Sequence, residues 1–252
     1  MNFSSELLNS NRVKEVFDSQ YDIDINGDGI FDRNKEHGTW GYDLCGQISL
    51  AFVLENLTGD RDWLYPIYSS MNLLKNNPNY TDTTSVRDLA KALTIAQYRY
   101  MLPSINQSGS LHNIHYYAYS YGQVFYYKLN KTPDFQNRVF SFESTTIWAP
   151  HNYDRDTFIY PDQIRSQLDS GHYHATLVDI STNLGGRLKL YNTGVTHWVV
   201  VTGLSKFNYS NLDDIDNWVK IYNPFKNRTE YYRWSEFRNS VHSATSLELW
   251  SN

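Results

Sequence analysis

The spacing of apolar residues predicts a buried helix over residues 43–59. One face of this segment carries Leu44, Ile48, Ala51, Phe52, Leu54 and Leu57. Asp43 is the predicted N-cap, and Gly59 is the predicted stop. The chain's single cysteine, Cys45, therefore lies in the first turn of the predicted helix.

The spacing of apolar residues also divides the rest of the chain into predicted helices followed by predicted strands. Helical spacing recurs at 4–18, 61–75, 85–101 and 160–171, and β-branched and aromatic runs at 174–181, 197–205 and 218–225 predict strands. The tyrosine-rich segment 110–132 fits either a helix or a strand. Because the helices come first and the strands follow, the sequence predicts an α+β fold, with an N-terminal helical part packed on a C-terminal antiparallel sheet.

Composition narrows the classes of partner. The 252 residues are 40 % hydrophobic and 16 % aromatic, which is enough for one domain with a substantial core. The net charge is −5, and the 22 basic residues are scattered, so neither nucleic acid nor an anionic membrane is an expected partner. No apolar run approaches the ~18 residues of a membrane span, and the N-terminus lacks a signal-peptide pattern.

The placement of Cys45 points to nucleophilic chemistry. A thiol in the first turn of a helix is favoured as the thiolate, because unpaired backbone N–H groups and the helix dipole stabilise an anion there. A catalytic thiol also needs a base, held in turn by a third group. Among eight histidines, His197 opens the strand HWVVVTGL, and the next strand, WVKIYNPF, ends with Asn223, whose side-chain carbonyl can orient the imidazole.

Three blocks of the chain resemble papain-like cysteine peptidases. CGQISLAFVLENLTG, THWVVVTGL and KIYNPF are most similar to the bacterial group related to double-glycine, bacteriocin-processing peptidases. The resemblance implies Cys45 as nucleophile, His197 as general base and Asn223 as the orienting residue. It also implies a single catalytic domain over 1–252, with an N-terminal segment at 1–41, a helical part at 42–110 and a sheet part at 160–252.

One position departs from the family pattern. Papain-like enzymes usually carry a glutamine about six residues before the cysteine, where its amide helps to bind the oxyanion. This chain has Thr39 there, and Gln47 follows the cysteine, about 200° round the helix from it. The candidates for the second oxyanion donor are therefore Thr39, Tyr42 and Gln47.

A candidate calcium loop precedes the helix. In DINGDGIFD, acidic and amide side chains alternate before a glycine, as in EF-hand loops; the candidate ligands are Asp24, Asn26, Asp28, Ile30 through its carbonyl, Asp32 and Glu36. The twelfth position is Lys35 rather than a glutamate, so a solvated Asx-rich turn is the alternative. Calcium would favour a secreted or surface-attached protein; the catalytic chemistry itself requires no cofactor.

Two other histidines have the spacing of metal ligands. His172 and His174 have no Cys or acidic neighbour at metal spacing in the sequence, so a surface strand start is the preferred interpretation.

The sequence therefore predicts a cysteine-dependent hydrolase that acts on peptide or isopeptide bonds of a protein or peptide substrate. An amidase, a deamidase or an acyltransferase with the same triad stays open. A second alternative is a non-catalytic binding module with an aromatic face that includes Trp40, Trp148 and Tyr153. A third is that the segment 60–159 forms a lid that makes activity conditional.

Overall fold

The computed structural model describes residues 44–59, 63–74, 85–101, 114–121, 123–148, 161–180, 189–190, 195–205, 207–224 and 228–251. Its helices are α3 (Cys45–Thr58), α4 (Leu64–Leu74), α5 (Val86–Ala96), the π-helix η1 (Gln97–Met101), α6 (Pro161–Asp169) and α7 (Trp234–Ser240). Its strands are β1 (Ile114–Ser120), β2 (Gln123–Leu129), β3 (Phe142–Trp148), β4 (Tyr173–Ile180), β5 (Val195–Leu204), β6 (Trp218–Asn223), β7 (Arg228–Arg233) and β8 (Val241–Ser251). The combination of helices with an antiparallel sheet confirms the α+β class.

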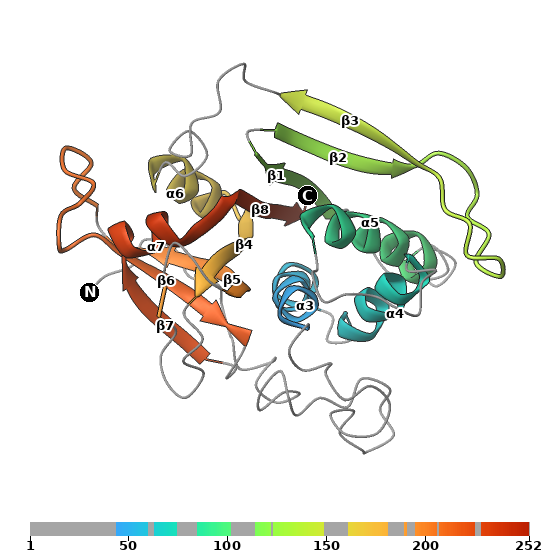
Figure 1. The fold of residues 1–252 in the computed structure, drawn as a ribbon, viewed down its shortest axis with the longest axis horizontal. Helices are drawn as coiled ribbons and strands as arrows, with labels where there is room; N and C mark the ends of the chain where they lie inside the picture. The colour runs from blue at the N-terminus through green and yellow to red at the C-terminus, as the bar shows by residue number, and fades with distance from the viewer. Residues whose placement is uncertain are drawn as a thin grey trace.

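The strands form one antiparallel sheet in the order β3-β2-β1-β8-β4-β5-β6-β7 (Figure 1). The sheet begins earlier in the chain than predicted, because the ambiguous segment 110–132 forms the hairpin β1–β2. Burial alternates along β1, with Ile114, Tyr116 and Ala118 inside, and this period of two is the pattern of a strand. The strands β3, β7 and β8 and the helix α7 were not predicted.

The predicted nucleophile helix forms, but its start lies one residue later than expected. The N-cap position belongs to Leu44, which makes no side-chain cap hydrogen bond, so the assignment of Asp43 as N-cap is wrong. The first helical residue is Cys45 itself. Gly59 ends the helix at φ 73°, a left-handed conformation that glycine adopts without a Cβ clash, and its N–H donates to the carbonyl of Glu55.

Apolar side chains cover both faces of the sheet. On one face α3 and α5 pack on Ala175, Trp198, Val200, Tyr222 and Leu247, and we call this cluster the α3-side core. On the other face α6 and α7 pack on Val178, Val199, Val201, Val219 and Ile221, and we call this cluster the α6–α7 core. Figure 1 shows the two groups of helices on opposite sides of the strands β4 and β5. Because they are buried on both faces, these strands do not alternate simply between apolar and polar residues in the sequence.

The N-cap of α5 is expected to contribute measurably to stability. Ser85 Oγ accepts from the Asp88 N–H at 3.1 Å, and its hydroxyl donates to the Asp88 carboxylate at 2.9 Å. Ser85→Ala should therefore lower the free energy of unfolding by about 1 kcal/mol. Urea unfolding followed by circular dichroism measures the change, and a variant as stable as the wild type would contradict it.

None of the described helices has both the length and the apolar character needed to cross a bilayer.

Candidate active site

The structure places His197 and Asn223 in contact. His197 is the third residue of β5, Asn223 is the last residue of β6, and the two strands are paired. His197 Nε2 lies 3.0 Å from Asn223 Oδ1. Both residues are buried, with 5 % and 0 % of their surfaces exposed. The amide therefore fixes the orientation of an imidazole that has little other freedom.

The contact also fixes the tautomer of His197. An amide oxygen only accepts hydrogen bonds, so Nε2 carries the hydrogen and Nδ1 is left as the basic nitrogen. Burial lowers the pKa of His197 from 6.5 to about 4, against the opposing effects of the Asn223 hydrogen bond and the charge of Glu230. At neutral pH the ring is uncharged and can accept a proton.

Cys45 starts α3 and is itself buried, with 7 % of its surface exposed. It belongs to the α3-side core, together with Trp198 and Tyr222 of the two strands that carry His197 and Asn223. Its position in the first turn agrees with the prediction. The backbone N–H groups of that turn favour a negative charge on the sulfur.

The strand register assigns the imidazole and the thiol to different sheet faces. His197 pairs with Val178, a residue of the α6–α7 core, whereas the next residue, Trp198, belongs to the α3-side core. Consecutive strand residues point to opposite faces, so His197 and Asn223 lie on the α6–α7 side. The register therefore places the His197 ring on the opposite face of the sheet from the α3-side core that contains Cys45.

Of the three oxyanion candidates, the structure describes Gln47. It is buried in α3, and its Oε1 atom has no hydrogen-bond partner among the residues that the structure describes. Two residues along a helix correspond to a rotation of about 200°, so Gln47 is turned away from the Cys45 side of α3. Thr39 and Tyr42 lie outside the described residues.

The candidate calcium ligands Asp24, Asn26, Asp28, Ile30, Asp32 and Glu36 also lie outside the described residues. Within the described ranges, no group of three or more His, Cys, Asp and Glu side chains has the arrangement of a metal site.

His172 and His174 flank the start of β4, as predicted, but His174 is buried rather than on the surface. The acidic partner missing from the local sequence comes from β8: His172 Nδ1 lies 2.7 Å from Glu248 Oε1. His174 Nε2 contacts Gln167 Oε1 at 2.9 Å, and burial lowers the pKa of His174. The pairing of β8 brings Glu248 to His172 from 76 residues away, which sequence spacing does not reveal.

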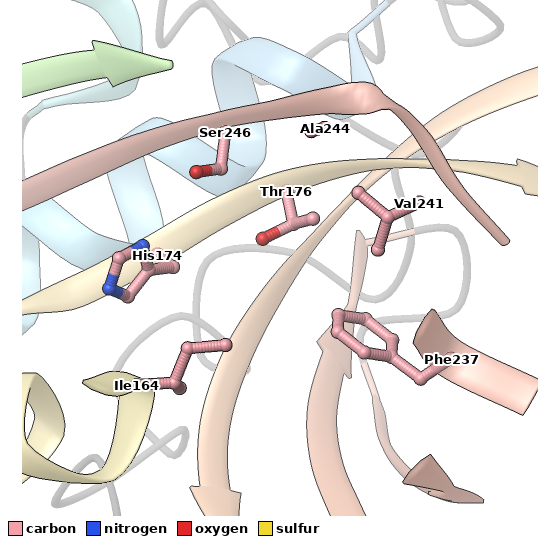
Figure 2. A pocket seen from close by; sticks show the side chains of 7 residues that line it. All are labelled: Ile164, His174, Thr176, Phe237, Val241, Ala244 and Ser246. Carbon is pink, nitrogen blue, oxygen red and sulfur yellow. The ribbon is translucent and has the colours of Figure 1, made fainter. Parts of the chain in front are cut away.

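A small pocket lies on the same side of the sheet as His174. Figure 2 shows side chains from α6, β4, α7 and β8 around it; they are Ile164, His174, Thr176, Phe237, Val241, Ala244 and Ser246. Three of the lining residues (Ile164, Phe237 and Val241) belong to the α6–α7 core. The pocket is therefore on the opposite sheet face from the core that contains Cys45.

Glu230 is a further residue that the sequence analysis missed. It lies on β7 opposite Ile221, and it bonds to Arg228 and to the hydroxyl of Tyr232. Its charge favours the protonated form of His197. The alternation of residues in RTEYYR, which predicts a strand with Glu230 and Tyr232 on one face, is the signal that could have identified it.

Comparison with protein-family models, with curated proteins and with solved structures gives no significant match to this chain.

Proposed function

We propose that this protein is a cysteine-dependent hydrolase of papain-like architecture that cleaves peptide or isopeptide bonds. Cys45 is the nucleophile, His197 is the general base and Asn223 holds the imidazole. The observation that carries the proposal is the buried contact of 3.0 Å between His197 Nε2 and Asn223 Oδ1. It leaves Nδ1 basic, and it links two residues that the sequence marks as catalytic partners of a helix-initiating thiol.

The proposed reaction has two steps. In the first, the Cys45 thiol gives its proton to His197, the sulfur attacks the acyl carbon, and the imidazolium returns the proton to the leaving amine. In the second, water gives a proton to the imidazole and attacks the thioester, which releases the acid and regenerates the thiol. No redox partner is required. If an amine takes the place of water, the same site acts as an acyltransferase.

Iodoacetamide alkylation tests the nucleophile and the base. In the wild type, the rate at Cys45 should reach its plateau well below the ordinary thiol pKa of about 8.5, because the backbone N–H groups of the first turn of α3 favour the thiolate. In His197→Ala the rate should fall by at least about 10-fold at pH 6. The rate is measured from pH 4 to 9 by mass spectrometry.

The matched control is His172→Ala, which removes an imidazole that pairs with Glu248, outside the proposed triad. It should leave the alkylation profile unchanged. A wild-type profile centred near pH 8.5, unaffected by His197→Ala, would refute the hydrolase proposal.

The second candidate function is that of a binding module on the same scaffold. The observation that favours it is the burial of His197 on the opposite sheet face from the α3-side core. In this case the His197–Asn223 pair is a buried polar contact that joins β5 to β6. The alkylation profile separates the two functions, because an idle buried thiol reacts slowly at every pH below its ordinary pKa.

A further inference from the structure

A second imidazole of the sheet is held by a buried carboxylate. His242 Nδ1 lies 2.8 Å from Asp179 Oδ1. The Asp179 side chain is 8 % exposed, whereas the His242 side chain is 40 % exposed. The carboxylate is thus fixed in the protein, and the ring that it orients can reach other groups. With Nδ1–H donated to Asp179, Nε2 is the free basic nitrogen.

This pair lies on the same sheet face as the core that contains Cys45. Val178 of β4 pairs with Val241 of β8, and both residues belong to the α6–α7 core. Asp179 and His242 each follow one residue later, so their side chains point to the α3 side. Of the two imidazoles that begin strands near the end of β4, His242 therefore shares the face of α3 and His197 does not.

A large bulge in β8 sets the direction of His242. Thr176 pairs with Ser246 and Val178 pairs with Val241, so the four residues from 242 to 245 stand opposite the single residue Leu177. Ser243 and Ala244 have φ angles of 51° and 48°, a left-handed conformation that residues with a Cβ rarely adopt. Tyr121, with a φ of 48°, donates its N–H to the Ser243 carbonyl at 3.1 Å. Bulges and strained backbone of this kind occur preferentially beside functional groups, where they redirect a side chain.

The charges also favour His242 as a proton acceptor. A thiol that gives its proton to an imidazole leaves an anion and a cation, and the cation needs a stabilising partner. Asp179 supplies a negative charge at hydrogen-bond distance from His242. His197 has a neutral amide as its partner, and its burial disfavours the charged ring. His242 therefore has a carboxylate as its hydrogen-bond partner, whereas His197 has an uncharged amide.

We propose that His242, oriented by Asp179, is a second proton acceptor for the thiol of Cys45. This inference rests on the proposed cysteine chemistry and adds one residue to it. The proton passes from Sγ to Nε2 of His242, while Nδ1–H stays on Asp179. In this route Nε2 of His242, in place of His197, returns the proton to the leaving amine once the thiolate has attacked the acyl carbon, so the step needs no other reactant.

Alkylation of Cys45 in His242→Gln and Asp179→Asn tests the role. At pH 6 the rate should fall by about 10-fold or more in His242→Gln, and less in Asp179→Asn, which keeps the imidazole but not the charge. His172→Ala is the matched control, because it removes another carboxylate-paired histidine from the opposite sheet face, and it should leave the rate unchanged. Thermal unfolding of each variant shows that the rates belong to folded protein.

The outcomes separate this inference from the proposed function. A wild-type plateau that is lost in His197→Ala but kept in His242→Gln would overturn the inference and leave the hydrolase proposal intact. A loss of the plateau in His242→Gln supports the inference. A wild type without any plateau below pH 8 would overturn both, because no base then serves the thiol.

A cross-link measures the proximity directly and does not depend on catalysis. Because Cys45 is the only cysteine, His242→Cys creates a single pair of thiols. A short bis-alkylating reagent should join this pair within the protein, and mass spectrometry of the peptides identifies the link. His172→Cys is the control, and it should react without a link to Cys45. A His242→Cys protein that folds and gives no link would overturn the inference.

Discussion

Replacing Phe52 with alanine should lower the free energy of unfolding by about 3–5 kcal/mol. Phe52 lies in the middle of α3 and is 1 % exposed. Its ring stacks on Tyr222 of β6, with the ring centroids 3.9 Å apart and an angle of 5° between the planes. The truncation removes this stacked contact between α3 and the strand that carries Asn223, and it leaves a cavity that close-packed neighbours fill only in part.

Chemical denaturation monitored by tryptophan fluorescence measures this loss. Tyr222→Phe is a matched control, because it keeps the stacked ring and removes a buried hydroxyl that makes no hydrogen bond within the described part of the chain. This control should be neutral or slightly stabilising. Tyr65→Ala, at a side chain that is 49 % exposed, should change stability by less than about 0.5 kcal/mol. A Phe52→Ala protein as stable as Tyr65→Ala would show that α3 is not anchored through this stack.

Acidification should remove about 3 kcal/mol of stability through His197, between pH 6.5 and pH 4. The pKa of His197 is about 4 in the folded protein and about 6.5 in the unfolded chain. Between these values the unfolded chain binds more protons than the folded protein, so stability rises with pH. The contribution is fully present above pH 6.5 and is lost as the pH falls towards 4.

The comparison with His197→Gln isolates this contribution, because glutamine does not titrate. Urea unfolding at pH 7 and at pH 4.5 should show a smaller difference between the two pH values in the variant than in the wild type. His174, whose pKa burial also lowers, contributes equally to both proteins and cancels in the comparison. An identical pH dependence in the two proteins would mean that His197 is not held neutral by burial.

The burial of His197 also affects its ability to act as a base. The hydrogen bond to Asn223 joins β5 to β6, and burial lowers the pKa of His197, which disfavours the protonated ring. His242, in contrast, has the carboxylate of Asp179 as its hydrogen-bond partner. In a simple triad, one histidine accepts the thiol proton and returns it to the leaving group. Here His197 and His242, on opposite faces of the sheet, would share these two tasks.

Local pattern was sufficient for the helices α3, α4, α5 and α6 and for the central strands β4, β5 and β6. The apolar spacing around Ile48 and Phe52 predicts α3, because one face of a helix must be buried wherever the chain packs it. The runs in β4, β5 and β6 predict strands for the same reason. The contact of His197 with Asn223 could also be predicted, because two consecutive antiparallel strands bring the start of one beside the end of the next.

Tertiary structure decided the properties that depend on distant segments. The strand β8 lies between β1 and β4, and it brings Glu248 to His172 and His242 to Asp179, over separations of 76 and 63 residues. The register of β4 with β5 assigns His197 to one face, and the bulge of β8 turns His242 to the other. A one-residue change in register moves a side chain to the opposite face, and nothing in the local sequence specifies which register the long-range pairing selects. Residue types and helix periods thus follow from the sequence by itself, whereas the choice of imidazole that shares a face with Cys45 follows only from the assembled sheet.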